Sequence, residues 1–350
     1  MISITRRCAT FALVFSGVGL WNLQESGTKA RFRGVSVVSD QVAWASGSQS
    51  TCLRTTDGGL SWKRLVVPDA EGLDFRDVHA FDEKSACLLS IGSGELSRIY
   101  RTEDGGATWT LRHRNTDPNG FLDAIAFWNG SSGIALGDPV DGRFVILRTS
   151  DGGHSWTKIP DSGMPLALPG EGAFAASGTC LITSGKDHAW FGTGGGKAAR
   201  IFRSEDGGKT WAVSETPLRA GIASAGVFSI AFRDSLHGLA VGGDYKSPED
   251  PTGNFAITTD GGVTWNVPPT KFPAGFRSAV AYAPLRAGVA LAVGPSGSDV
   301  STDGGLSWTR MDGSGWHALG FDRSGLAGWA VGEDGRIARF DPAFLQTPGR

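Results

Sequence analysis

Short apolar strands that end in glycine recur along this chain at regular intervals. Each of them consists of about five mostly apolar and small residues, which is typical of half-buried or buried strands. Seven such runs are present, at residues 43–47, 88–92, 133–137, 190–194, 238–242, 290–294 and 328–332. Because no helical periodicity of comparable length accompanies them, we predict an all-β fold.

A second repeated pattern, S/T-x-D-G-G-x-S/T-W, follows six of the seven strands. Asp-Gly favours a tight turn, because glycine reaches positive φ without a Cβ clash. We expect the carboxylate to accept hydrogen bonds from N–H groups two or three residues on. We expect the tryptophan to begin the next strand and to supply a large apolar surface there. The invariant pairs are Asp57 and Trp62, Asp104 and Trp109, Asp151 and Trp156, Asp206 and Trp211, Asp260 and Trp265, and Asp303 and Trp308. Six peripheral turns that face six directions cannot form one active site, so these residues are predicted to be structural.

The spacing of these boxes predicts the architecture. Successive aspartates are separated by 47 (57 to 104), 47 (104 to 151), 55 (151 to 206), 54 (206 to 260) and 43 (260 to 303) residues. A period of this length without helices is typical of propeller blades of four strands. In the first blade we expect strands at 34–39, 42–46 and 51–55 and a fourth from Trp62, with the box as the last turn. The chain is therefore predicted to be a single seven-bladed propeller over residues 21–345.

The last blade is predicted to take its outer strand from the start of the chain. Asp341 ends the third strand of that blade, but Pro342 replaces the first glycine of a box and cannot continue a ladder. Trp21-Asn22-Leu23-Gln24 precedes the first blade and resembles a strand led by a box tryptophan. We expect it to pair with residues 337–340, which would close the ring and remove exposed sheet edges.

Composition narrows the class of protein further. The 33 basic and 35 acidic residues give a net charge of −2, so the chain lacks the charge excess of a nucleic-acid-binding protein. Cys52, Cys87 and Cys180 have no disulfide or zinc spacing and are predicted to be buried apolar residues. We expect neither a metal nor a cofactor.

The first twenty residues differ from the repeats. Arg6 and Arg7 precede thirteen uncharged, mostly apolar residues, 8–20. This run is too short to span a bilayer as a helix and is typical of a signal peptide. We therefore predict a signal peptide at residues 1–20 and an exported protein, periplasmic or extracellular.

The candidate binding face lies opposite the boxes. In a propeller the loops between blades share one face with the loops between the second and third strands, whereas the box turns lie on the other face. Insertions at 161–175 and 243–253 lengthen this loop face, and such loops commonly carry function. Its mixed charges fit a peptide or a small polar ligand, with ordinary solvated loop polarity as the alternative. The candidates are Arg76, Asp77, Asp123, Asp138, Asp141, Glu171, Lys197, Asp244, Tyr245, Lys246, Arg277 and His317.

The repeated pattern is that of Asp-box, or BNR, propellers. Sialidases contain it, but the [F/Y]-R-I-P motif of their first arginine is absent, and the nearest run is Phe276-Arg277-Ser278-Ala279. The boxes, the Gly-Trp-Ala-Val-Gly type of strand and the N-terminal tryptophan strand together resemble the photosystem II stability/assembly factor family over nearly all of 21–341. This resemblance implies a monomeric, non-enzymatic scaffold that binds a protein partner, such as a membrane protein or its exported segment, and no nucleic acid.

An enzymatic alternative remains open at this point. A sialidase-like hydrolase or lyase acting on carbohydrate would need two carboxyl groups separated by roughly 5–9.5 Å in a cleft. On the predicted loop face, only Asp77, Asp123, Asp138 and Glu171 could supply them.

Overall fold

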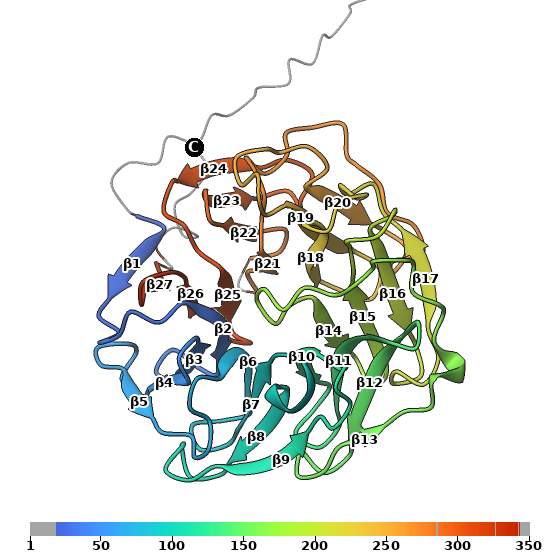
Figure 1. Cartoon of the computed structure of the whole chain (residues 1–350). Helices are drawn as coiled ribbons and strands as arrows, with labels where there is room; N and C mark the ends of the chain where they lie inside the picture. The colour runs from blue at the N-terminus through green and yellow to red at the C-terminus, as the bar shows by residue number, and fades with distance from the viewer. Residues whose placement is uncertain (1–18, 285, 326, 342, 344–350) are drawn as a thin grey trace, which may run out of the picture.

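Seven antiparallel sheets surround a central channel in the computed structural model, which describes residues 19–284, 286–325, 327–341 and 343 (Figure 1). The predicted seven-bladed all-β propeller is confirmed. Regular structure other than strands is limited, in these residues, to the short 3-10 turns η1 (Gly94–Leu96) and η2 (Asp161–Gly163). No described helix is long and apolar enough to cross a membrane. The predicted signal peptide lies outside the described residues, apart from its last two positions.

Each blade runs outward from the channel. Blade 1 contains β2 (Phe32–Val37), β3 (Ala43–Gly47), β4 (Thr51–Thr55) and β5 (Lys63–Leu65); blade 2 contains β6 (Asp74–Ala80), β7 (Ala86–Ile91), β8 (Arg98–Thr102) and β9 (Thr110–Arg114). Blade 3 contains β10 (Leu122–Phe127), β11 (Gly133–Val140), β12 (Arg143–Thr149) and β13 (Thr157–Lys158); blade 4 contains β14 (Leu181–Ser184), β15 (His188–Gly192), β16 (Arg200–Ser204) and β17 (Ala212–Glu215).

The remaining blades follow the same order with two exceptions. Blade 5 contains β18 (Ala225–Phe232), β19 (Gly238–Asp244) and β20 (Phe255–Thr258); blade 6 contains β21 (Ala279–Tyr282), β22 (Ala290–Gly294), β23 (Gly297–Ser301) and β24 (Thr309–Asp312). Blade 7 contains β25 (Ala318–Phe321), β26 (Gly328–Val331), β27 (Ile337–Phe340) and, outermost, β1 (Trp21–Gln24).

Blade 5 departs from the expected four strands. Only a single bridge, between Ile257 and Asn266, replaces its outer ladder. Pro268 and Pro269 follow within three residues of that bridge. Since proline has no N–H to donate, the segment cannot extend into a fourth strand.

Each Asp-box is a closed hydrogen-bonded turn. The Thr55 hydroxyl donates to Asp57 Oδ1 (2.8 Å) and accepts from the Gly59 N–H (2.8 Å). Ser61 donates from its N–H to Asp57 Oδ1 (3.0 Å) and from its hydroxyl to Oδ2 (2.6 Å). The backbone N–H bonded to Asp57 thus lies four residues on, whereas Asp206 accepts from the N–H groups three (Lys209) and four (Thr210) residues on. Gly58 and Gly59 both have positive φ (72° and 86°), which favours glycine there.

The same turn bonds recur in the other five boxes and stabilise the ionised carboxylate. The bonds that close these turns are made by the equivalent residues around Asp104, Asp151, Asp206, Asp260 and Asp303. Hydrogen bonds from Ser61, then from Thr55, lower the pKa of Asp57 to about 2. The boxes therefore stay ionised at neutral pH and keep their acceptors.

The apolar core is divided among the blade interfaces. Seven of the eight clusters of buried side chains among the described residues combine residues of two adjacent blades. Trp109 of blade 2, for example, packs edge-on against Trp44 of blade 1 with ring centroids 6.2 Å apart. Cys52, Cys87 and Cys180 are buried and free, as predicted. The blades are consequently joined to each other mainly by side-chain packing.

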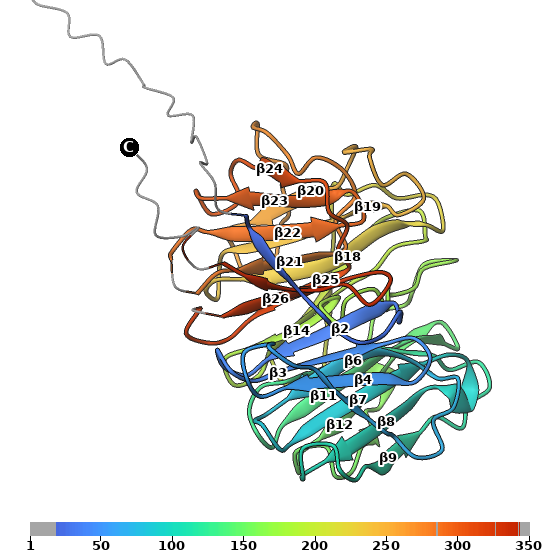
Figure 2. The ribbon, with the colours of Figure 1, turned by 90° about the vertical axis from the view of Figure 1, so that its left-hand side faces the viewer.

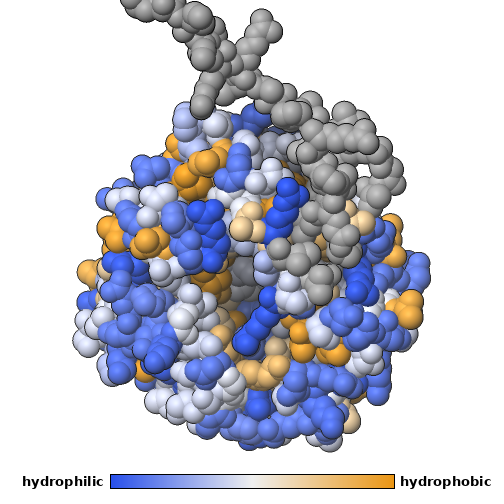
Figure 3. All heavy atoms as spheres, turned by 180° about the vertical axis from the view of Figure 1, so that it is seen from behind, coloured by the Kyte–Doolittle hydropathy of each residue, from blue (hydrophilic) through white to orange (hydrophobic). Residues whose placement is uncertain are grey.

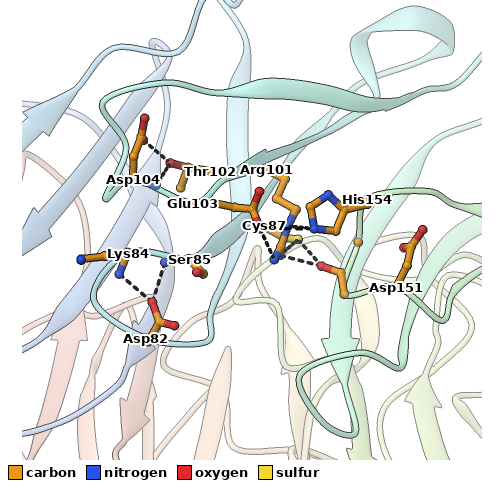
Figure 4. Close-up of polar contacts among 12 residues, drawn as sticks. Asp82, Lys84, Ser85, Cys87, Arg101, Thr102, Glu103, Asp104, Asp151 and His154 are labelled. Carbon is orange, nitrogen blue, oxygen red and sulfur yellow. Dashed lines mark hydrogen bonds and ion pairs between the residues drawn. The ribbon is translucent and has the colours of Figure 1, made fainter.

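Arginines of the third strands connect neighbouring boxes, a feature that the sequence analysis missed. Arg101 of β8 donates from Nη1 to the carbonyl of Gly152 in the next box (2.6 Å) and from Nε to His154 Nε2 (3.2 Å) (Figure 4). Arg148 bonds in the same way to the Gly207 carbonyl (2.7 Å). Each such bond satisfies a carbonyl of the turn and fixes one blade against the next.

The N-terminal strand closes the ring, as predicted. β1 pairs antiparallel with β27, with Trp21 opposite Phe340 and Gln24 opposite Ile337, and the two strands are labelled side by side in Figure 1. The side view of Figure 2 shows the blue N-terminal strand against the red strands of the last blade. The Asp341 N–H donates to the Leu20 carbonyl (3.1 Å), which extends the ladder to the divided seventh box.

Gln24 connects the closing strand β1 to blade 1. Its Oε1 accepts from the indole N–H groups of Trp62 (3.1 Å) and Trp329 (2.9 Å), and its Nε2 donates to the Gly58 carbonyl (3.0 Å). On the other side, the Trp21 indole donates to Ser298 Oγ of blade 6 (3.0 Å). One four-residue strand therefore connects blades 6, 7 and 1.

We expect deletion of residues 21–26 to destabilise the whole propeller, because it removes a ladder and leaves two buried indole N–H groups without their acceptor. Each such loss costs about 1–3 kcal/mol, so the thermal midpoint should fall by well over 5 °C. Leu23→Ala is the matched control, since Leu23 is 73% exposed. Calorimetry of the three proteins measures this, and a deletion variant that melts with the parent would contradict the closure.

Candidate functional site

Bulges on the inner strands place side chains at the mouth of the channel. One extra residue interrupts the register of β2, β6, β10 and β18, and the bulged residues are Arg33, Arg76, Asp123 and Phe228. A bulge changes the direction in which the side chain of the extra residue points. Asp138 is the extra residue of β11 beside Asp123. Four blades thus contribute to one site by the same local device.

These residues line a cavity of about 550 Å³, here called the mouth pocket. It lies on the face that carries the interblade loops, which Figure 1 shows from the front. Its charged and aromatic lining residues are Arg33, Arg76, Asp123, Asp138, Phe121, Phe174, Phe228, Tyr245, Phe276, His317 and Glu333. The channel also opens on the box face, where Figure 3 shows a central hollow and where Ile182, Ile230, Phe232, Val280 and Phe321 are among the lining residues.

Part of the insertion before blade 4 runs across the channel below the mouth. In this crossing segment, residues 172–178, the Ala173 N–H donates to Asp138 Oδ1 (2.9 Å) and the Ala175 carbonyl accepts from Arg76 Nη1 (3.0 Å). Ser177 donates to the Ser278 carbonyl of blade 6 (2.9 Å). The crossing segment is therefore held by blades 2, 3 and 6.

An aromatic wall rises from the crossing segment. Phe174 stacks on Phe228 with ring centroids 3.8 Å apart, and Phe276 meets Phe228 edge-on at 4.7 Å. Tyr245 approaches Phe228 edge-on at 6.1 Å and is 47% exposed. The wall offers ring faces and edges to whatever enters from the loop face.

The basic side of the pocket is compensated by neighbouring acids. Arg76 pairs with Asp74 (2.8 Å), and His317 Nε2 lies 2.8 Å from Glu333 Oε1. Burial, then the charges of Arg33 and neighbouring arginines, lowers the pKa of His317 to about 3, so that the imidazole is neutral. Burial and Arg76 also lower the pKa of Arg33 to about 10.

The acidic side is not compensated. Asp123 is 1% exposed, and neither of its carboxylate oxygens has a hydrogen-bond partner among the described residues. Burial and then Asp138 raise the pKa of Asp123 well above its usual range. Burial raises the pKa of Asp138 to about 6, although the hydrogen bond from the Ala173 N–H partly opposes this rise. Burial likewise raises the pKa of Asp77 to about 7, although Asp77 accepts a hydrogen bond from the Ile125 N–H (2.8 Å).

The structure brings five of the twelve predicted face residues to the mouth pocket: Arg76, Asp123, Asp138, Tyr245 and His317. Asp77 lies deeper, against the crossing segment, with its Oδ1 only 2.4 Å from the position of a Cβ on Gly178. Asp244 accepts from the Lys246 N–H (3.0 Å) and so closes the turn that carries Tyr245. Asp141, Lys197 and Lys246 are exposed and line no part of the pocket.

Two further predicted residues form internal ion pairs. Arg200 Nε donates to Glu171 (2.8 Å), which also accepts from the Thr193 hydroxyl (2.6 Å). Arg277 Nε donates to buried Asp299 (2.5 Å). Both acids and both arginines are buried or nearly so, and their charges are used to hold loops together.

The surroundings of the carboxylates limit the reactions that the site could catalyse. Of the four carboxylates considered for an enzyme, Glu171 is paired with Arg200 and Asp77 does not line the pocket, which leaves Asp123 and Asp138. Among the described side chains, no group of three or more His, Cys, Asp or Glu is placed to hold a metal ion. The pocket is best suited to binding, through ring faces and unsatisfied carboxylates.

Sequence reasoning missed Arg33, Phe174, Phe228, Phe276 and Glu333. Arg33 and Phe228 are bulged residues, and a bulge leaves no pattern of its own in the sequence; Phe276 and Glu333 lie in loops that no motif marked. Phe174 alone had a signal, because it is an aromatic residue in an insertion already singled out for function.

Comparisons with known proteins agree with the recognition made from the motifs. The family described as "Photosynthesis system II assembly factor YCF48" matches residues 75–221. The photosystem II assembly lipoprotein Ycf48 of Synechococcus sp. (strain CC9902) is 28% identical over 226 residues, which cover 63% of this chain and 56% of that protein. The chloroplastic photosystem II stability/assembly factor HCF136 of Arabidopsis thaliana is 29% identical over 147 residues, 37% of this chain and 34% of that one. This chain thus spans about half or less of the length of these relatives.

Two further similarities concern the fold and the alternative function. A solved structure of YCF48 bound to D1 peptide has a TM-score of 0.66 and 18% identity, and covers 92% of this chain and 97% of that chain. The xyloglucanase Xgh74A of Acetivibrio thermocellus is 26% identical over 249 residues, 61% of this chain and 28% of that protein. The structural likeness shows the fold alone.

Stability should depend on pH through Asp77. Its pKa is raised to about 7, so between about pH 4 and 7 the folded chain holds a proton that the unfolded chain releases, and stability falls as the pH rises through this range. We expect Asp77→Asn to be more stable than the parent above pH 7, by about 1–4 kcal/mol, and equal to it near pH 4. Asn keeps an acceptor for the Ile125 N–H.

Urea unfolding at pH 4.5, 6 and 8 measures this difference. The control is Asp141→Asn, because Asp141 is exposed and lies outside the pocket. A constant difference between Asp77→Asn and the parent at all three pH values would show that the carboxyl titrates normally.

Proposed function

We propose that this chain, a photosystem II assembly factor-like propeller with BNR repeats, is a non-enzymatic scaffold that holds a protein partner at its mouth pocket. The observation that carries the proposal is the combination, in one open cavity, of a stacked aromatic wall and charged groups that other residues leave unsatisfied. Aromatic residues surrounded by polar groups are the composition of binding hot spots.

The size of the pocket defines what part of a partner it would hold. A cavity of about 550 Å³ lies within the range of small-ligand sites and is too small for a folded element. A few side chains of an extended segment fit it, with neighbouring contacts on the loop face around them. The partner would therefore present a chain end or a loop.

The similar proteins support a proposal for the partner and its location. Given that a YCF48 has been solved with a D1 peptide, we take the partner to be a membrane protein or its exported segment. The N-terminal run at 8–20 and the lipoprotein and chloroplastic relatives support an exported protein, in a periplasmic or lumenal type of compartment.

A photo-crosslinking residue at Tyr245 should capture this partner in the organism of origin. Tyr245 is half exposed at the pocket rim, so its replacement leaves the fold intact. Leu60, which is 90% exposed in a box on the opposite face, is the matched control. We expect one dominant crosslinked membrane or exported protein from position 245 and none from position 60.

The same experiment can refute the assigned face. If position 60 captures the partner and position 245 does not, the scaffold binds through its box face. If neither position captures a protein while the labelled chain is abundant and folded, the proposed function is wrong.

Hydrolysis of xyloglucan is the second candidate, because of the similarity to a xyloglucanase. Of the four carboxylates considered for an enzyme, Asp123 and Asp138 are the two that line the mouth pocket. We expect no release of reducing ends from xyloglucan by the purified chain. Release that Asp123→Asn and Asp138→Asn abolish would replace the scaffold proposal with an enzymatic one.

A further inference from the structure

The two acids of blade 3 lack the partners that other charged groups of the mouth pocket have. Arg76 pairs with Asp74, and His317 lies against Glu333. Arg33 also lines the pocket; it forms no ion pair among the described residues, but the charges of Glu333 and Asp74 stabilise its cation. In blade 3, by contrast, Asp138 receives one backbone N–H, from Ala173, Asp123 receives none, and no described lysine or arginine pairs with either. The charge missing beside these two acids is therefore positive.

Asp123 is the independent sign that a ligand belongs here. A buried polar group without a hydrogen-bond partner costs free energy, and native chains rarely keep one without a purpose. Asp123 lines the pocket and is only 1% exposed. Neither of its carboxylate oxygens accepts a hydrogen bond from a described residue. A cation that entered the pocket would bring the donors that the fold omits.

The rest of the lining is suited to the same ligand. Phe174, Phe228 and Phe276 form the apolar wall of the cavity that Asp123 and Asp138 also line. The negative faces of aromatic rings attract ammonium and guanidinium groups, and the rings also pack against alkyl chains. A charged head on an aliphatic stem therefore meets complementary groups at both ends.

We propose that the mouth pocket binds the basic side chain of a lysine or arginine presented by the partner protein, with its charged head at Asp138 and Asp123 and its stem against the aromatic wall. This inference rests on the proposed function, since it names the chemistry of the partner segment. A free aliphatic amine has the same chemistry, and the test below separates the two sources.

The groups that face Asp123 predict how binding depends on pH. Asp138 lies beside it, Asp77 lies on β6, and the Cys180 thiol precedes β14; these three are neutral or negative. The cations that line the same pocket are Arg76, which is paired with Asp74, and Arg33, while His317 is neutral above its pKa of about 3. Burial raises the pKa of Asp138 to about 6 and that of Asp123 higher, so a cation would displace a proton on binding. Affinity for a cation should therefore increase as the pH rises from 5 to 8.

Isothermal titration of the full chain tests the proposal with three probes. N-acetyl-lysine methylamide represents a lysine within a chain, N-acetyl-norleucine methylamide is its uncharged counterpart, and pentylamine is the free amine. We expect the lysine probe to bind at least tenfold more tightly than the norleucine probe, and to bind more weakly at pH 5 than at pH 8. Equal binding of the two amides would overturn the proposal, and binding of pentylamine alone would show that the ligand is a small cation.

Variants identify the residues responsible. Asp138→Asn and Asp123→Asn should each weaken the lysine probe at least tenfold, whereas Asp141→Asn, an exposed position in the same loop, should not. Circular dichroism and thermal unfolding establish that each variant is folded, and Asp123→Asn should be no less stable than the parent, because it removes a buried ionisable group. Retained affinity in both pocket variants would refute the assignment.

The outcome is independent of the crosslinking experiment. If Tyr245 captures a partner and the lysine probe does not bind, the scaffold function stands and the basic ligand is wrong. If Tyr245 captures nothing, the scaffold function itself fails, whatever the probe does.

Discussion

The hydrogen bonds that the Asp-box carboxylate accepts are the interaction on which this structure depends. In each box one carboxylate binds the hydroxyl two residues before it and both the N–H and the hydroxyl four residues after it, as Asp57 does with Thr55 and Ser61. These bonds fix two glycines at positive φ, and the turn then directs a tryptophan into the interface with the preceding blade. Packing between blades, and hence the closed ring, follows from a turn that is local in sequence.

Closure of the ring determines where a binding site can form. Once β1 pairs with β27, blade 7 has its outer strand and is fixed to blade 1, and the seven inner strands surround one channel. The box turns lie at the periphery of one face, where they make structural contacts such as those of Arg101 and Gln24. On the other face the bulges at Arg33, Arg76, Asp123 and Phe228 direct side chains into the mouth pocket.

Features that repeat along the sequence could be predicted, whereas features that occur only once could not. The boxes, the glycine-ended strands and the divided seventh box are repeated, so the number of blades and the closure by Trp21–Gln24 could be predicted. The missing outer strand of blade 5 could have been read from Pro268 and Pro269, but the repeat concealed it. The path of the crossing segment is unique to one place in the chain and depends on contacts with three other blades, which no local pattern encodes.

From the sequence, only the face of the propeller that carries the candidate site could be predicted, and not which residues of that face line the pocket. Loop topology correctly brought Asp123, Asp138 and Tyr245 together, but it could not distinguish them from Glu171 and Arg277, whose partners Arg200 and Asp299 come from distant positions in the chain. A charged residue in a loop has the same appearance in sequence whether it faces a ligand or an internal partner. The distinction lies in pairing, which only the folded chain reveals.

The aspartates of this protein show the same distinction in physical terms. In the boxes, several donors surround each carboxylate and hold its pKa low; in and below the mouth pocket, burial with few donors raises the pKa of Asp77, Asp123 and Asp138. The box aspartates contribute to stability as anions, whereas these three lower it when they ionise. Asp77 lies outside the pocket and is bonded to the Ile125 N–H, but Asp123 and Asp138 line the pocket without a cation. A fold with six satisfied carboxylate turns has the means to satisfy a carboxylate, so these two are explained better by an external partner than by the demands of folding.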